Sequence, residues 1–350
     1  MTTPVKSELF GFMASEIAEA IKPFGIQSYR GKQIAEWLYK HGVRDFDAMT
    51  NLSNDQRATL AKNFTIINLR QKAVQHSGDG HTSKFLLSFS DDMAVETVLM
   101  RHRYGNSVCI STQVGCAMGC AFCASTLGGL ARNLTCGEIL AQVLYINELL
   151  KLEERKVDSI VIMGSGEPLA NYDNVLSFIR LIHEPYCLNL SYRSITLSTS
   201  GIVPEIYKLI EEGLPITLSI SLHAPNNKLR TSLMPVNRRY PLEQVLEAGH
   251  KYSQITGRRV TYEYTLIAGI NDQPTHAHQL AALLKGQLAN VNLIPINPVP
   301  ERNLFRPAPS DITRFEQLLK SEHINVTVRR EMGADIDAAC GQLRHKVLSK

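Results

Sequence analysis

Three cysteines fall within a short run of this 350-residue chain, Cys116-Ala-Met-Gly-Cys120-Ala-Phe-Cys123. A loop with this spacing can bring its thiolates around one inorganic centre. A structural zinc site normally has four ligands in two pairs, and no second Cys or His pair with such spacing occurs. Three thiolates suit a [4Fe-4S] cluster in which one iron stays open for another ligand. Zinc and three structural thiols remain as alternatives.

A glycine-rich turn, Gly164-Ser-Gly166-Glu167-Pro168, follows a predicted strand over residues 159–163. A dinucleotide-binding fingerprint requires a third glycine at position 169, where this chain has leucine. The sequence therefore predicts a tight turn that presents the Glu167 carboxylate, which suits a cationic amino group. A turn without a ligand is the alternative.

Other chemistry-bearing side chains follow later strands. Polar groups stand at three more predicted strand ends: Ser198, Ser221 to His223, and Asn297. Each residue alone is a weak signal, because Ser and Asn commonly begin turns or cap helices. Near the C-terminus, Cys340 follows two acidic residues and is either a catalytic thiol or a small buried hydrophobe. Cys109 precedes the cysteine run in a context typical of a buried thiol.

The elements that must position these groups alternate after residue 112. Strands are predicted over residues 159–163, 194–198, 216–222, 260–267, 291–296 and 325–329. Helices are predicted over residues 135–151, 171–184, 203–212, 241–255, 273–285 and 310–321. Such alternation indicates right-handed βαβ units around a parallel sheet, either a barrel or a doubly wound sheet. In both architectures the functional groups gather at the carboxyl ends of the strands.

The first part of the chain lacks this alternation of strands and helices. Residues 1–70 are predicted to be helical, with helices over 10–21, 31–41 and 52–63. Residues 71–112 are predicted as a β extension with strands over 84–90, 95–101 and 107–112. Together with residues 113–350, these segments make three expected units.

Composition excludes several classes of protein. Hydrophobic residues make up 44% and charged residues 20%, so the chain can bury a large core and is not disordered. No apolar run approaches the ~18 residues that a membrane helix needs. The net charge of +4 is too small to argue for a nucleic-acid partner. Seven cysteines, an odd number, without a secretory signal lead us to expect a cytoplasmic protein with no membrane association.

The cysteine spacing, with Phe122 before the last cysteine, resembles the radical S-adenosylmethionine (SAM) superfamily, and Gly164 to Pro168 resembles its GxGEP motif. Further segments resemble the RlmN/Cfr family of RNA methyltransferases over nearly the whole chain. They are residues 104–116, Gly129-Leu-Ala-Arg132-Asn133, LSTSG, SISLHAP, NLIPINPVP and the segment around Cys340. Residues 124–129 are similar to the RlmN members rather than to the Cfr members.

The resemblance implies an α/β fold, a partial (βα)6 barrel with a helical RNA-binding accessory domain and a short β extension. It implies methylation of adenine carbon 2 in 23S rRNA and in tRNA, with a [4Fe-4S] cluster, SAM and an electron donor such as flavodoxin or ferredoxin. A monomer is expected.

The resemblance also assigns residues. Cys116, Cys120 and Cys123 would hold the cluster. The SAM-binding residues would be Gly166, Glu167, Ser198, Ser221, Leu222, His223 and Asn297. Cys340 would carry the methyl group, Cys109 would form a transient disulfide with it, and Glu96 would accept a proton. Arg30, Lys32, Arg132, Arg238 and Arg239 are candidate phosphate contacts, with solvated surface charge as the alternative.

Two other functions remain open at this stage. One is a radical SAM enzyme that acts on a small molecule or a peptide. The other is a non-catalytic RNA-binding protein that carries zinc or a cluster.

Overall fold

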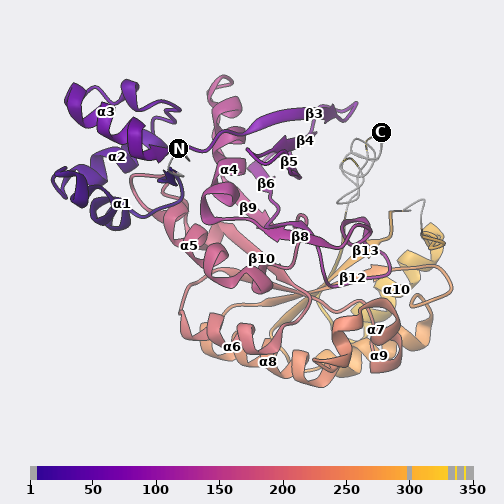
Figure 1. Cartoon of the computed structure of the whole chain (residues 1–350). Helices are drawn as coiled ribbons and strands as arrows, with labels where there is room; N and C mark the ends of the chain where they lie inside the picture. The colour runs from indigo at the N-terminus through magenta and orange to yellow at the C-terminus, as the bar shows by residue number, and fades with distance from the viewer. Residues whose placement is uncertain (1–5, 298–301, 330–335, 337–342, 344–350) are drawn as a thin grey trace.

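The structure is a computed structural model that describes residues 6–297 and 302–329, together with Ile336 and Leu343. Three helices, α1 (Ala14–Ile21), α2 (Arg30–Tyr39) and α3 (Asn54–Asn63), form the first part of the chain. They lie to one side of the main sheet in Figure 1. Two very short strands, β1 (Ser7–Glu8) and β2 (Phe64–Thr65), pair in parallel and close this helical part at its two ends. The sequence patterns identified the helices but not these strands.

The main sheet has ten strands in the order β14-β13-β12-β11-β10-β9-β6-β5-β4-β3. Its parallel part comprises β9 (Ser159–Ile162), β10 (Ile195–Thr199), β11 (Thr217–Ser221), β12 (Val260–Leu266), β13 (Ala289–Pro295) and β14 (Val326–Val328). These strands are neighbours in chain order without reversal. A doubly wound sheet would reverse its order at a switch point, so the strand order selects a partial barrel and confirms the expected fold.

Helices cover the outside of the parallel strands (Figure 1). They are α4 (Cys136–Lys151), α5 (Tyr172–His183), α6 (Val203–Glu211), α8 (Leu242–Thr256), α9 (Pro274–Leu284) and α10 (Pro309–Ser321). Each agrees with a predicted helix to within about two residues. A further short helix, α7 (Asn227–Leu233), lies in what the sequence patterns left as a loop. No helix among the described residues is both long and apolar enough to cross a bilayer.

The antiparallel strands β3 (Arg70–His76), β4 (Thr82–Ser88) and β5 (Ala94–His102) extend the sheet beyond β6 (Gly105–Cys109). Strand β6 pairs in parallel with β9, so the extension is continuous with the barrel sheet. The polar, half-exposed strand β3 was missed from sequence because it lacks an apolar alternation.

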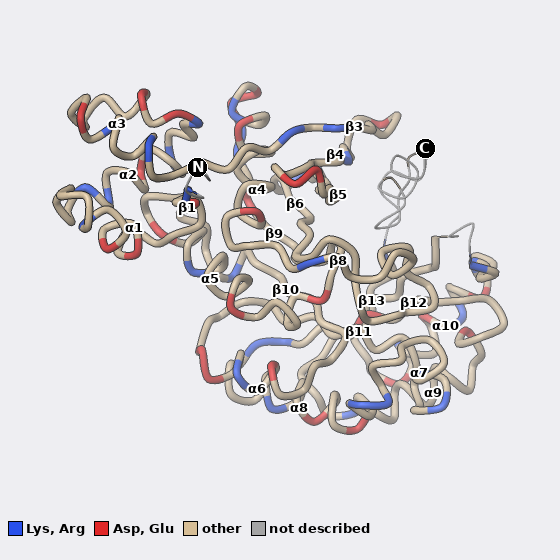
Figure 2. The backbone as a smooth tube through the Cα atoms, in the orientation of Figure 1, with Lys and Arg blue, Asp and Glu red and all other residues tan. Residues whose placement is uncertain are grey.

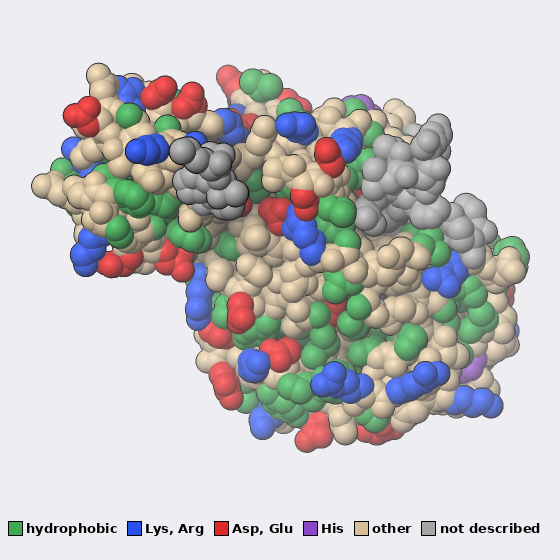
Figure 3. All heavy atoms as spheres, in the orientation of Figure 1, with side chains coloured by type: hydrophobic (Ala, Val, Ile, Leu, Met, Phe, Trp, Pro, Cys, Tyr) green, Lys and Arg blue, Asp and Glu red, His purple; other side chains and the backbone are tan. Residues whose placement is uncertain are grey.

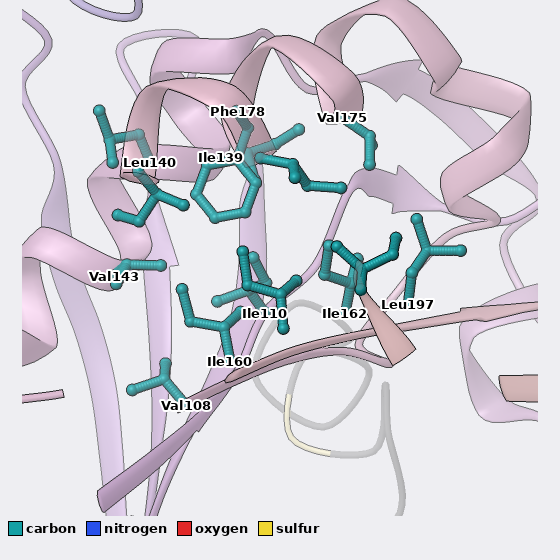
Figure 4. Packing of buried hydrophobic residues seen from close by; sticks show 14 of the residues in the cluster. Val108, Ile110, Ile139, Leu140, Val143, Ile160, Ile162, Val175, Phe178 and Leu197 are labelled. Carbon is teal, nitrogen blue, oxygen red and sulfur yellow. The ribbon is translucent and has the colours of Figure 1, made fainter. Parts of the chain in front are cut away.

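Side chains on and just after β6 point alternately to the two faces of the sheet. Val108 and Ile110 pack with Ile160 and Ile162 beneath helices α4 and α5 (Figure 4). Because successive strand residues point to opposite faces, Cys109 between them faces the other side, toward the barrel interior.

The helical part is held to α4 by two glycines. A Cβ on Gly11 would lie 2.4 Å from the backbone nitrogen of Gly137, and a Cβ on Gly137 would lie 2.3 Å from the carbonyl oxygen of Phe10. The Tyr39 hydroxyl reinforces this contact by accepting from the Gly11 N–H at 3.1 Å. The absence of side chains at these two positions therefore allows backbone-to-backbone packing of the two parts.

Charge is distributed without a strong asymmetry on the face in view. Figure 2 shows Lys and Arg interspersed with Asp and Glu along the helices. Figure 3 shows both signs over the visible surface, with no extended field of one sign. This agrees with the small net charge of +4.

Candidate active site

A cavity of about 300 Å³ opens at the carboxyl ends of the barrel strands. This volume is at the lower end of the range for small-molecule sites. The residues predicted from sequence that line it are Cys116, Cys120, Cys123, Gly166, Glu167, Ser198, Ser221, His223 and Asn297. The fold therefore brings segments that are far apart in the sequence to one rim.

The loop that carries the three thiols is closed at its base by a small antiparallel pair, β7 (Gln113–Gly115) and β8 (Leu130–Asn133). The Cys116 N–H donates to the Gly129 carbonyl at 3.0 Å. Gly115 has φ +80°, and a Cβ there would lie 2.0 Å from that same carbonyl oxygen. These strands are only a few residues long, which explains why sequence patterns did not identify them.

The three cysteines fit an iron–sulfur cluster by their donor type and their position. Burial raises the pKa of the Cys116 thiol to about 11 and raises that of Cys120 as well. In the ligand-free chain these thiols are therefore protonated, and ligation must displace their protons. No group of three or more His, Cys, Asp or Glu side chains is assembled as a metal site within the described ranges. The thiols line one cavity without yet converging on one point.

Glu167 is buried and held by three hydrogen bonds. Its carboxylate accepts from the Thr199 hydroxyl at 2.7 Å, from the Ser200 N–H at 2.6 Å and from the Leu169 N–H at 3.1 Å. Burial raises the pKa of Glu167, and these donors act in the opposite direction. A carboxylate so oriented on the cavity wall is suited to an ammonium group.

Gly166 allows this turn to approach the neighbouring chain. It has φ +109°, and a Cβ there would lie 2.7 Å from the Cβ of Gln113. The side chain of Gln113 in turn accepts from the Glu167 N–H at 2.8 Å. The turn at Gly166 therefore packs closely against β7.

His223 and Leu222 take different positions. The His223 Nδ1 accepts from the Thr265 N–H at 2.9 Å, and burial lowers the pKa of His223 to about 3. The ring is neutral, carries its proton on Nε2 and contacts Phe122 edge-on at 4.6 Å. The side chain of Leu222 is fully buried in the core and does not line the cavity.

One face of the sheet connects Cys109 with the β extension. Directly paired residues run across four strands, Lys84 with Val98, Val98 with Cys109, and Cys109 with Val161. Paired residues project to the same face, so Lys84 and Cys109 share the face that continues into the barrel interior. Glu96, two residues before Val98 on β5, also projects there.

Glu96 lies within this interior face as a buried carboxylate. It is 5% exposed and forms an ion pair with Lys84, whose Nζ lies 3.3 Å from its Oε2. The strand pattern of the sequence, taken alone, places Glu96 on the solvent side. The structure contradicts that placement: Glu96 is buried, and Leu343 packs against Leu86 and Ala94 on the same face of the sheet.

The Ser111 hydroxyl links this region to the glycine-rich turn. It donates to the Glu96 carbonyl at 2.8 Å and accepts from the Ser165 N–H at 3.0 Å. The backbones of Glu96 and Ser165 are thereby joined through one side chain. Neither Glu96 nor Cys109 lines the cavity described above, and Cys340 lies outside the described residues.

Two further charged residues are fixed by the fold near the site, Arg132 and Glu263. Arg132 donates to both oxygens of Glu138 at 2.7 Å and to Asp91 at 2.7 Å. Its charge therefore holds β8 to α4 and to the β4–β5 turn, and its expected phosphate contact stays a prediction. Glu263 lines the cavity between Ser219 and Asn292 and was not identified from sequence. Its position on the inner face of β12 is a signal that strand alternation could have provided.

The strand order and the cysteine-lined cavity define a radical SAM enzyme. The family model described as the Radical SAM superfamily matches residues 110–281, and that of the Ribosomal RNA large subunit methyltransferase N-terminal domain matches residues 7–66. A crystal structure of a radical SAM methyltransferase from Sphaerobacter thermophilus superposes with a TM-score of 0.92. It is 44% identical, covering 96% of this chain and 98% of that chain.

Two curated relatives are each named as a probable dual-specificity RNA methyltransferase RlmN. The protein of Symbiobacterium thermophilum is 54% identical, over 99% of this chain and 93% of its own length. The protein of Staphylococcus aureus is 51% identical, over 97% of this chain and 93% of its own length. The chain belongs to the RlmN family of radical SAM RNA methyltransferases, which use a [4Fe-4S] cluster and SAM.

Proposed function

We propose that this enzyme methylates carbon 2 of an adenosine in 23S rRNA and of the adenosine 3′ to the anticodon in some tRNAs. The observation that carries the proposal is the shared interior face of Glu96 and Cys109, which continues from the barrel into the β extension. A base and a thiol on one buried face suit a reaction in which a proton is removed and a sulfur-bound intermediate is resolved.

Cys116, Cys120 and Cys123 would hold the cluster, and Glu167 would orient the amino group of SAM. The remaining contacts to SAM would come from Gly166, Ser198, Ser221, His223, Asn297 and the backbone of Leu222. When bound, one SAM would supply the methyl group, and a second SAM with the cluster would supply the radical chemistry that removes a hydrogen atom from it. A thiolate suits the first step because carbon 2 of adenine and the methyl group of SAM are both electron-poor.

Three side chains, Cys340, Glu96 and Cys109, would then each carry out one part of the reaction. Cys340 accepts the methyl group as a thiolate and later carries the RNA through a methylene bridge. Glu96 takes the proton from carbon 2 of the adduct. Cys109, as a thiolate, would attack the sulfur of Cys340 and break the carbon–sulfur bond. The released methylene takes up a proton and becomes the methyl group, and a disulfide joins the two cysteines.

Leu343 supports a position of Cys340 near this face. It is 3% exposed and packs against Leu86, which pairs directly with Glu96. Three residues of chain span at most ~11 Å. We therefore propose that Cys340 acts at the face that carries Glu96 and Cys109.

Residues 1–70 would form the RNA-binding accessory domain, residues 71–112 the β extension and residues 113–350 the catalytic barrel. Tyr29 is 57% exposed and its ring lies 4.9 Å from the Arg30 guanidinium. An exposed aromatic ring beside a cation suits stacking on an unpaired base. We expect a cytoplasmic monomer that takes electrons from a flavodoxin or a ferredoxin.

The test is mass mapping of the product made by the purified enzyme on 23S rRNA and tRNA. We expect 2-methyladenosine in both. A main product of 8-methyladenosine would overturn the carbon-2 assignment, and methylation of neither RNA would overturn the substrate assignment.

A further inference from the structure

Arg230 on α7 is a fully buried cation. It is the largest of the fully buried side chains among the described residues. Its guanidinium donates to the Ser200 carbonyl at 2.7 Å, the Ser221 carbonyl at 3.2 Å and the Asn237 Oδ1 at 2.9 Å. A fourth, longer bond of 3.4 Å reaches the Tyr240 carbonyl. Its Nε is buried and has no hydrogen-bond partner among the described residues. Every acceptor is neutral.

No carboxylate of the described chain lies within ion-pair distance of this guanidinium. Burial lowers the pKa of Arg230 to about 10, so the side chain is still charged near neutral pH. Burying an unpaired charge costs several kcal/mol, and such charges are normally paired or placed beside a metal centre. Among the described groups, Cys120 is the one whose negative form stabilises the Arg230 cation, and this thiol becomes a thiolate on binding a cluster.

The backbone packs the helix that carries Arg230 against the loop that carries Cys120. Helix α7 docks on the loop of the three cysteines, where the Ala121 N–H donates to the Leu233 carbonyl at 2.9 Å. Cys120, Leu233 and Met234 form part of one small apolar cluster. The guanidinium is therefore enclosed between the cysteine loop and the ends of β10 and β11.

We propose that Arg230 is the internal counter-charge of the iron–sulfur cluster and raises its reduction potential. Three thiolates on a cluster leave it with a net negative charge, which grows when the cluster accepts an electron. A buried cation nearby stabilises the more negative, reduced form more strongly. Arg230 thereby favours the electron transfer that any radical SAM reaction requires, and its cation is neutralised only when the cluster is present.

A purely structural role is the competing explanation, because Arg230 also ties the carbonyl groups of Ser200 and Ser221 together. The two explanations differ in what the charge does. A structural brace needs the hydrogen bonds, and an electrostatic role needs the positive charge.

The test is an EPR-monitored redox titration of the anaerobically reconstituted enzyme, without RNA or SAM. We expect Arg230→Gln to lower the ratio of reduced to oxidised cluster at fixed potential about tenfold, which is 59 mV for one electron. Arg230→Lys, which keeps the charge, should remain close to the wild type. Lys228→Gln removes an exposed charge from the same helix and should leave the ratio unchanged. An unchanged potential in a fully loaded Arg230→Gln enzyme would overturn the proposal.

If Arg230→Gln loses its cluster, a second variant distinguishes the electrostatic role of Arg230 from a structural role. Asn237→Asp keeps an oxygen acceptor where the present one lies 2.9 Å from the Arg230 Nη1, and it adds a negative charge. The new carboxylate should pair with Arg230 and lower the potential in the same direction. A wild-type potential in Asn237→Asp, with iron and sulfide content intact, would leave Arg230 as a structural brace.

Discussion

Lys84 and Glu96 form a buried ion pair across strands β4 and β5, with Nζ and Oε2 3.3 Å apart and side chains 2% and 5% exposed. The two residues are not directly opposite each other, since Lys84 pairs with Val98 and Glu96 pairs with Leu86. The contact is therefore a diagonal one on the interior face, which long side chains can make. It gives each of the two buried charged groups a partner of opposite charge within the sheet.

This pair leads to a prediction about stability. Lys84→Met should lower the free energy of unfolding by ~3 kcal/mol, because it removes the cation 3.3 Å from a buried carboxylate. The double variant Lys84→Met/Glu96→Gln should recover much of that loss, as measured by urea unfolding of the apoprotein. Equal destabilisation in the single and double variants would show that the pair is not coupled.

Replacing each of the two proposed catalytic cysteines should give a different defect in the reaction. Cys340→Ala removes the methyl acceptor, so no methyl group should appear on protein or RNA. Cys109→Ala keeps the acceptor and should accumulate RNA bound covalently to the protein, seen as a gel shift that nuclease abolishes. Because the two residues act in sequence, the double variant should resemble Cys340→Ala alone. Normal turnover by Cys109→Ala would refute its role.

His223 should make the folded chain less stable in acid. Its pKa is about 3 in the folded chain against an ordinary 6.5. Between these values the unfolded chain binds a proton that the folded chain does not, so stability falls as the pH falls. The contribution is about 1.4 kcal/mol per pH unit, or ~2 kcal/mol between pH 6.5 and about pH 5.

The measurement is urea unfolding of the apoprotein at several pH values, for wild type and for His223→Asn. Asparagine is chosen because His223 has φ +56°, a conformation that asparagine tolerates. The difference in stability between the two proteins should change with pH at that slope. The raised pKa of Glu167 acts in the opposite sense in both proteins and cancels in the comparison. Parallel pH profiles would contradict the assignment of a neutral buried ring.

Gly166 should not tolerate a side chain. Gly166→Ala places a Cβ 2.7 Å from Gln113 at φ +109°, so we expect a loss of at least about 1 kcal/mol in stability and weaker SAM binding by calorimetry. Gly128→Ala is the matched control, because a Cβ there meets nothing within 4 Å. Wild-type SAM affinity in a folded Gly166→Ala enzyme would argue against a role of this turn in the SAM site.

The sequence by itself determined the elements and the motifs that are local in the chain. The strand and helix periodicities after residue 112 located the parallel strands and the six long helices, because alternation and helical spacing are properties of short segments. The cysteine run and the turn at Gly166 and Glu167 were also identified, since their functional atoms lie within a few residues of one another.

Only the tertiary structure decided the relationships that depend on strand order, register and burial. The uninterrupted order of β9 to β14 selected the barrel, and the register of β4, β5 and β6 placed Lys84, Glu96 and Cys109 on one face. The isolated sequence around Glu96 is compatible with either face, because a one-residue shift of register exchanges inside and outside. Arg230 depends on the fold in the same way. A charged residue on a short helix is normally solvated, and only the packing of α7 against the cysteine loop buries it.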